Sequence, residues 1–243
     1  MSWHLGRLCG FDLETTGVDV ESDRIVTACV VQCGGKHPTQ SATWIANPGV
    51  EIPAEATAVH GITTEQARAE GQPAGQVVEQ VVAALTHAIG AGLPVVAMNA
   101  GFDLTMLDRE ARRHRVYPLA DTSVGDELRV VDPRVLDKAA DRYRRGGRKL
   151  EDLCRHYSVA LDGAHSADAD ALAACRVAWR LGSTRPELAA MDIEALHHAQ
   201  IAWAAEQAAG LRAYFEKTPG KEHLAAGVRP EWPLIPAQGV SET

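Results

Sequence analysis

Two acidic residues lie at the end of the first apolar segment of the chain, in the stretch "GFDLETTG" from Gly10 to Gly17. Side chains alternate between the two faces of a strand, so Asp12 and Glu14 share one face and Leu13 takes the other. Two like charges a few Å apart repel by about 4 kcal/mol at an effective dielectric constant of about 20. A cation must therefore balance this pair, and the rest of the sequence has to indicate which one.

Two more acidic positions follow the same logic. Asp103 comes directly after "VVAMNAGF", where a buried strand should end and a helix begin, a usual position for active-site residues in an open α/β sheet. Asp170 belongs to "HSADADA", in which Ser166 can cap a helix, with His165 just outside and Asp170 about one turn inside it. Taken alone, each cluster has a structural interpretation that is at least as good, such as a helix cap for Asp103.

Together, the four acids and the histidine indicate one chemistry. Carboxylate oxygens favour Mg²⁺ or Mn²⁺, and the lack of Cys and His at ligand spacing argues against structural zinc. Two ions held by carboxylates suit the in-line attack of water on a phosphodiester. A histidine whose ordinary pKa lies near neutrality can accept the proton of that water.

The stretches "FDLETTG", "NAGFDL" and "HSADADA", in this order and spacing, resemble the three motifs of the DEDDh family of 3′–5′ exonucleases. The proofreading epsilon subunit of bacterial DNA polymerase III is a member of that family. The resemblance covers about residues 5–182 and includes "IANPGVEIPAEATAVHGIT" between the first two motifs, while Met98 departs from the polar residue that many relatives carry. It implies an α/β, ribonuclease H-like fold, in which helices flank a mixed five-stranded sheet.

The resemblance also implies a role for each matching residue. Asp12, Glu14 and Asp170 would bind one Mg²⁺ or Mn²⁺ ion, and Asp12 would bridge to a second ion held by Asp103. His165 would be the general base. The residues expected to contact the terminal nucleotide are Leu13 (through its backbone), Thr15, Thr16, His60, Asn99 and Phe102.

Apolar patterning predicts the elements that position these residues. The expected strands cover 5–13, 24–32 and 41–48 as an antiparallel meander, with two short buried strands in "LPVVAMNA" and "LRVVDP". The expected helices cover 74–92, 103–115, 149–159 and 166–182. Strands that alternate with helices in this way predict one exonuclease domain over residues 1–184, built on a mixed sheet.

The remainder of the chain has a different character. We expect residues 185–218 to form a helical extension, either one long helix or two short ones. We expect residues 219–243 to form a loosely ordered tail. His197 and His198 of the extension are expected on the surface. The basic segment "DRYRRGGRK" (141–149) is interpreted equally well as a phosphate-binding loop or as a solvated one.

Composition limits the classes of partner. A net charge of −8 argues against a protein that coats long nucleic acids by charge alone, but it allows an enzyme that holds a few nucleotides. No apolar run approaches the ~20 residues of a membrane span, and the N-terminus lacks the pattern of a secretory signal. Five scattered cysteines without a C-x-x-C pair are typical of the reducing cytoplasm.

The sequence therefore predicts a metal-dependent 3′–5′ exonuclease that releases nucleoside monophosphates from single-stranded or frayed ends, with DNA favoured. Two alternatives stay open. One is an RNA 3′-end trimming exoribonuclease, because only contact with the 2′-hydroxyl would separate RNA from DNA. The other is a subunit with a mainly structural role beside a DNA polymerase, although the complete set of acids argues against a relic site. The sequence leaves a polymerase partner undecided.

Overall fold

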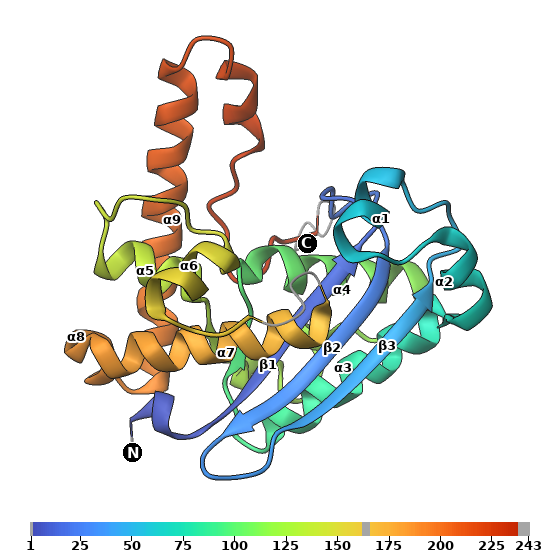
Figure 1. Ribbon diagram of the computed structural model, residues 1–243, viewed down its shortest axis with the longest axis horizontal. Coiled ribbons are helices and arrows are strands. Elements are labelled where there is room, and N and C mark those ends of the chain that lie inside the picture. The colour runs from blue at the N-terminus through green and yellow to red at the C-terminus, as the bar shows by residue number, and fades with distance from the viewer. Residues whose placement is uncertain (1, 162–165, 238–243) are drawn as a thin grey trace, which may run out of the picture.

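In a computed structural model of the chain, which describes residues 2–161 and 166–237, helices cover both faces of one mixed sheet (Figure 1). The sheet order among the described residues is β4-β3-β2-β1-β5-β6. The strands are β1 (Arg7–Thr15), β2 (Ile25–Gly34), β3 (Gln40–Asn47), β4 (Gln72–Pro73), β5 (Val95–Val96) and β6 (Val130–Val131).

The expected meander forms the centre of this sheet. β1 pairs antiparallel with β2, and β2 pairs antiparallel with β3, whereas β5 lies parallel to β1 and β6 parallel to β5. These are the five expected strands, so the predicted fold class is confirmed. The sixth strand, β4, is two residues long and ends in proline, so its sequence carries no periodicity that could predict it.

The helices also follow the prediction in large part. They are α1 (Ala54–His60), α2 (Thr64–Glu70), α3 (Ala74–Gly90), α4 (Ala100–His114), α5 (Pro133–Ala140), α6 (Leu150–Tyr157), α7 (Ala167–Thr184), α8 (Pro186–Ala189) and α9 (Ile193–Lys217). Short 3₁₀ turns cover Trp3–Leu5, Leu119–Asp121, Gly125–Glu127 and Glu222–Gly227. All five cysteines are buried free thiols. Within the described residues, no helix combines the length and apolar character that crossing a membrane requires.

Alternation along β1 divides the core into two layers. Odd-numbered residues such as Phe11 and Leu13 pack with the apolar faces of α3 and α4. Even-numbered residues point the other way, so Leu8 joins the layer of α7 and Gly10 faces the backbone of that helix. The same alternation sends Asp12 and Glu14 towards α7.

The extension consists of the short helix α8 and one long helix, α9, which covers the edge of the sheet beside β6. Gln200 is completely buried, accepts a hydrogen bond from the backbone N–H of Asp132 (2.7 Å) and donates to the carbonyl of Val130 (2.8 Å). His197 Nδ1 accepts from the N–H of Val130 (3.0 Å). These side chains replace the missing neighbouring strand, since unpaired buried backbone groups are costly. The expectation that His197 lies on the surface is therefore wrong, while His198 is exposed.

The tail folds back onto the domain. Trp232 is only 8% exposed and packs into the core layer of α3 and α4. The N–H of Ile235 donates to Thr105 Oγ1 in α4 (3.0 Å). As far as residue 237, the tail thus makes specific contacts, which the expected loose order did not include. The division of the chain into three segments stays a prediction.

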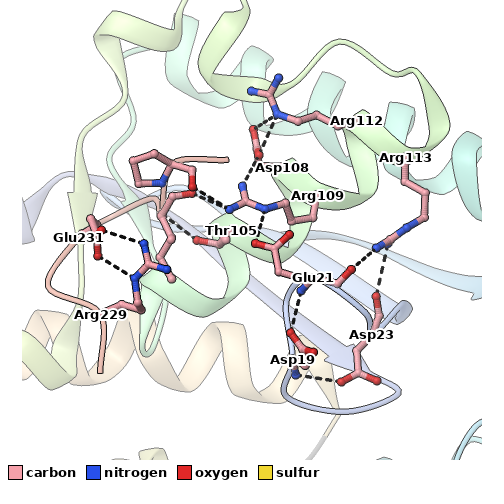
Figure 2. A network of polar contacts seen from close by, with 12 residues as sticks. Asp19, Glu21, Asp23, Thr105, Asp108, Arg109, Arg112, Arg113, Arg229 and Glu231 are labelled. Atoms are coloured by element: carbon pink, nitrogen blue, oxygen red, sulfur yellow. Dashed lines mark hydrogen bonds and ion pairs between the residues drawn. The ribbon is translucent and has the colours of Figure 1, made fainter. Parts of the chain in front are cut away.

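Arg109 of α4 links this tail to the loop that follows β1 (Figure 2). Its guanidinium donates to the carbonyl of Ile235 (3.0 Å), to Glu21 (2.9 Å) and to Asp108 (2.7 Å). Although Arg109 is 6% exposed, its charge is balanced by these two carboxylates. Helix α4 therefore holds both the tail and the loop next to the acids of β1.

Candidate metal and nucleotide site

Close packing of α7 on β1 brings the first and third acidic motifs together. A Cβ at Gly10 would lie 2.6 Å from the carbonyl oxygen of Ala171 and 2.8 Å from the sulfur of Cys175. Only glycine lets the helix approach the strand this closely, because real Cβ atoms do not make contacts under 3 Å. Gly10 shares its face with Asp12, and Ala171 directly follows Asp170. The packing that glycine permits thus positions the acids.

The carboxylates of Asp12, Glu14 and Asp170 form a compact triad. Each offers an oxygen, and the three oxygens lie within 4.8 Å of one another. A divalent cation lies about 2.0–2.6 Å from each of its oxygen ligands, so opposite ligands are about 4–5 Å apart. The triad therefore has the donor chemistry and the spacing of a Mg²⁺ or Mn²⁺ site.

Asp103 lies beside this triad without belonging to it. It is in the first turn of α4, is 4% exposed, and its Oδ1 accepts a hydrogen bond from the backbone N–H of Leu13 (3.1 Å). Because Leu13 separates Asp12 from Glu14 in β1, this bond fixes the acid of α4 next to the strand that carries the other two. Its role as a ligand of a second ion stays a prediction.

The acids of the site raise one another's pKa. Burial, and then the charges of Asp103, Asp170 and Glu14, raise the pKa of Asp12 well above its usual range. Burial, and then Asp170, raise the pKa of Glu14 to about 7. Burial also raises the pKa of Asp103, to which the charges of Asp132 and Glu14 add. Among the described residues, no lysine or arginine forms an ion pair with Asp12, Glu14 or Asp103, so their charge awaits a cation from solution.

The two threonines after Glu14 serve the loop that they begin. Thr16 is 5% exposed; its hydroxyl donates to Asp23 (2.8 Å) and accepts from the N–H of Arg24 (3.0 Å). The hydroxyl of Thr15 donates to the carbonyl of Gly17 (2.6 Å). Both hydroxyls therefore have partners inside the loop, and their contact with a nucleotide stays a prediction.

His60, at the end of α1, has a buried ring nitrogen that lacks an ordinary hydrogen bond. Its Nδ1 accepts from the N–H of Ile62 (3.1 Å), so the neutral ring carries its proton on Nε2. Burial lowers the pKa of His60 and favours this neutral form. Its Nε2 is buried next to the backbone of Thr15, which opposes part of this lowering, but among the described residues it makes no hydrogen bond of ordinary geometry. A buried donor of this kind suits the expected contact with a substrate.

Asn99 and Phe102 border the site at the start of α4. Asn99 is exposed, adopts a left-handed conformation (φ 65°), and its Oδ1 accepts from Arg134 (2.7 Å). Phe102 is half-buried, which leaves part of its ring open. Their contact with a nucleotide stays a prediction.

Asp132 supports the site and was not anticipated. It is 2% exposed, and its carboxylate accepts from the N–H groups of Asn99 (3.1 Å), Ala100 (3.0 Å) and Arg134 (2.9 Å). It therefore fixes the turn that leads into α4 and to Asp103. The signal was present in "LRVVDP", because an Asp-Pro pair after a strand is typical of a helix N-cap followed by its first residue.

His165, the expected general base, lies outside the described residues. Ser166 is the N-cap of α7, as the sequence predicts.

Comparisons with known proteins agree with this arrangement. The sequence profile of the exonuclease family (RNase_T) matches residues 9–178, well over half of the chain. The chain therefore belongs to the exonuclease family, and the resemblance drawn from its motifs is confirmed.

Individual relatives match only in part. A DNA polymerase III subunit epsilon-like protein of Rhodobacter capsulatus is 39% identical over 103 residues, which are 41% of this chain and 14% of that protein. Exonuclease I of E. coli in complex with a dT13 oligonucleotide has a TM-score of 0.62 at 19% identity. Exonuclease I of Methylocaldum szegediense has a TM-score of 0.59 at 21% identity. Both matches cover 75% of this chain and 42% of the other, so they support the fold.

Proposed function

We propose that this protein is a metal-dependent 3′–5′ exonuclease acting on single-stranded or frayed ends, with DNA favoured, that releases nucleoside 5′-monophosphates. The observation that carries the proposal is the triad of Asp12, Glu14 and Asp170, whose oxygens converge within 4.8 Å in an exonuclease-family domain. The preference for DNA is supported by the structural similarity to an exonuclease I bound to a DNA oligonucleotide.

The four acids would hold two Mg²⁺ or Mn²⁺ ions. Asp12, Glu14 and Asp170 would bind one, and Asp12 and Asp103 the other, because hard cations prefer carboxylate oxygens. When bound, a pair of ions supplies an activated water and stabilises the charge on the leaving oxygen. The raised pKa values of the acids match this role, since a bound cation offsets their repulsion.

The other site residues would handle the proton and the terminal nucleotide. His165 would accept the proton of the attacking water. His60 would donate a hydrogen bond through Nε2, while Phe102 and the backbone of Leu13 would flank the sugar and base. A base can enter such a site only when it is unstacked, which costs less for a mismatched or single-stranded end. We therefore expect faster removal from single-stranded and mismatched 3′ ends than from matched duplex ends.

End-labelled oligonucleotides test the proposal. Purified protein is incubated with DNA or RNA labelled at either end, with Mg²⁺, with Mn²⁺ or with EDTA. We expect 5′-labelled DNA to shorten stepwise in the presence of metal and to stay intact in EDTA. The Asp12→Asn variant is the control for a contaminating nuclease.

Three other outcomes contradict parts of the proposal. Shortening from the 5′ end, or cuts in circular single strands, would exclude a 3′–5′ exonuclease. Faster turnover of RNA would assign the site to RNA trimming. Intact substrates under every condition would favour a structural subunit.

A further inference from the structure

A hollow of about 630 Å³ opens beside the nucleotide site, between the exonuclease domain and the C-terminal part of the chain. Its lining runs from Asn99 and Phe102 along residues of α5 and α9 to the returning tail. Lys138 of α5 lies on one wall, Phe215 of α9 on another, and Trp232 of the tail closes it. The hollow is therefore continuous with the proposed site of the terminal nucleotide.

A second hollow of about 640 Å³ adjoins the first. Lys138 and Gln207 line both, and the second is bordered further by Arg142, Tyr143 and Tyr214. Both tyrosines are exposed, Tyr143 by 87% and Tyr214 by 51% of their surface. The two hollows together form one groove along α5 and α9, which is called the groove below.

Cations of α5 line this groove. Arg134 and Lys138 are four residues apart in the helix and so lie on one side of it, and Arg142 follows two residues after its end. Among the described residues, neither Arg134 nor Lys138 forms an ion pair with a carboxylate, and Arg134 instead donates to Asn99. Burial, and then the nearby guanidinium groups of Arg148, Arg134 and Arg142, lower the pKa of Lys138. Arg134 and Lys138 thus bring two cations to the groove, although the protein carries a net charge of −8.

The four acids along the groove already have hydrogen-bond partners, and Asp19 accepts from the N–H of Glu21 (3.0 Å) and the hydroxyl of Ser22 (2.7 Å). Asp132 accepts the backbone N–H groups that hold the start of α4. Glu231 pairs with Arg229 (2.8 Å), and Glu206 pairs with Arg142 (2.8 Å). The charges of Arg134 and Lys138 therefore remain available to an anionic ligand.

We propose that this groove binds the single strand upstream of the terminal nucleotide, with Arg134 and Lys138 on backbone phosphates and with Phe102, Phe215 and Tyr214 as stacking surfaces for bases. Cations that follow a backbone, combined with aromatic rings, are the usual means of holding single strands without sequence preference. The family profile ends at residue 178, before α9, so this wall of the groove lies outside the matched domain. The proposal rests on the proposed function for its starting point.

Binding without turnover tests the groove. Fluorescence anisotropy in EDTA compares oligothymidylates of about three and about sixteen nucleotides, a range that spans the site sizes of about 4–16 nucleotides typical of single-strand binding folds. An oligouridylate of the longer length, run in parallel, separates DNA from RNA. We expect the longer strand to bind more tightly, because only it reaches beyond the terminal site.

Two variants separate charge from stacking. Lys138→Gln should weaken binding of the longer strand and reduce the slope of log K against log salt by about 0.7, the value for one phosphate contact on a single strand. Phe215→Ala should weaken the same binding about fivefold or more while the salt slope stays constant. Lys36→Gln, in the turn between β2 and β3 at the opposite end of the sheet, removes an equal charge and should change neither quantity. Thermal unfolding of each variant checks that it is folded.

The groove and the nuclease can fail separately. Two results would refute binding of the strand in the groove. One is an affinity that does not depend on strand length. The other is folded Lys138→Gln and Phe215→Ala variants with the affinity and salt slope of the wild type, which would make a protein segment the better candidate occupant. If the wild-type protein trims 3′ ends and one of these two results is found, the proposed function still stands and only the groove proposal fails. If the wild-type protein trims nothing but its affinity depends on strand length and on Lys138 as expected, the groove proposal stands and the proposed function fails.

Discussion

Asp12, which is half-buried, and Asp137, which is fully buried, are carboxylates with opposite surroundings. Asp137 is completely buried, and it accepts from Arg144 (3.1 Å), Arg148 (2.7 Å) and the hydroxyl of Tyr157 (2.8 Å). Asp12 has other acids around it, and burial, followed by the charges of these acids, raises its pKa. Burying a charge is costly unless a partner balances it, so the protein balances one acid with arginines and leaves the other to a cation from solution.

The same comparison explains the basic segment 141–149. Arg144 and Arg148 are fixed on Asp137, and Arg142 is paired with Glu206. The first two therefore stabilise the fold. Because the guanidinium groups of Arg144 and Arg148 are bound to Asp137, they are not available to phosphates. Only the other, exposed basic residues of the segment can bind phosphates.

The sharpest test of the comparison is loss of turnover. Asp12→Asn or Asp170→Asn should abolish hydrolysis of single-stranded DNA, because each removes a ligand from the triad. Asp137→Asn, measured per folded molecule, should retain most of the activity. The rate of nucleotide release from labelled DNA in Mg²⁺ measures both. An Asp12 variant that keeps more than a few per cent of the wild-type rate would refute the metal assignment.

A smaller loss is expected at His165. A general base typically contributes about 10²–10⁴-fold, so His165→Ala should lose that much in kcat while it still binds metal and single strands. The acidic limb of the pH–rate profile should change as well. Kinetics equal to those of the wild type would remove His165 from the mechanism.

Stability should respond in the reverse order. Asp137→Asn leaves Arg144 and Arg148, which are 8% and 17% exposed, without their carboxylate, and breaking a buried pair costs about 3–5 kcal/mol. Asp12→Asn in EDTA should keep or increase the free energy of unfolding, because it relieves repulsion among the acids. Urea denaturation compares the two. If Asp12→Asn is the more destabilising variant, the contrast between the two acids is wrong.

The smallest expected effect is a pH dependence of the metal-free protein. Folding raises the pKa of Glu14 from 4.5 to about 7, so between these values the folded state holds more protons than the unfolded state. The free energy of unfolding should therefore fall as the pH rises through this window. At pH 8, added Mn²⁺ should restore it, because the ion binds only the folded protein.

Glu14→Gln provides the control for this dependence and should make it shallower, while the raised pKa values of Asp12 and Asp103 keep the remainder. Denaturation curves in EDTA across the window measure the effect. A Glu14→Gln variant with the same pH dependence as the wild type between 4.5 and 7 would contradict the raised pKa of Glu14.

Local patterns in the sequence were enough to identify the acids of the site and most of the strands and helices around them. Alternation in β1 placed Asp12 and Glu14 on one face, and apolar spacing predicted α3, α4, α6 and α7 with ends that differ by a few residues. The prediction succeeds because these features depend on neighbours one to four positions away. The resemblance of three short motifs to one family then predicted which acids would meet.

Only the tertiary structure decided how the remaining polar groups are used. The contacts of His197 and Gln200 with β6 join positions 67 to 70 residues apart, and Trp232 reaches Asp132 across 100 residues. Asp137 likewise shows its arginine partners only once the chain has folded around it. A side chain's burial and its partners depend on the packing of distant segments, and no local spacing encodes that packing.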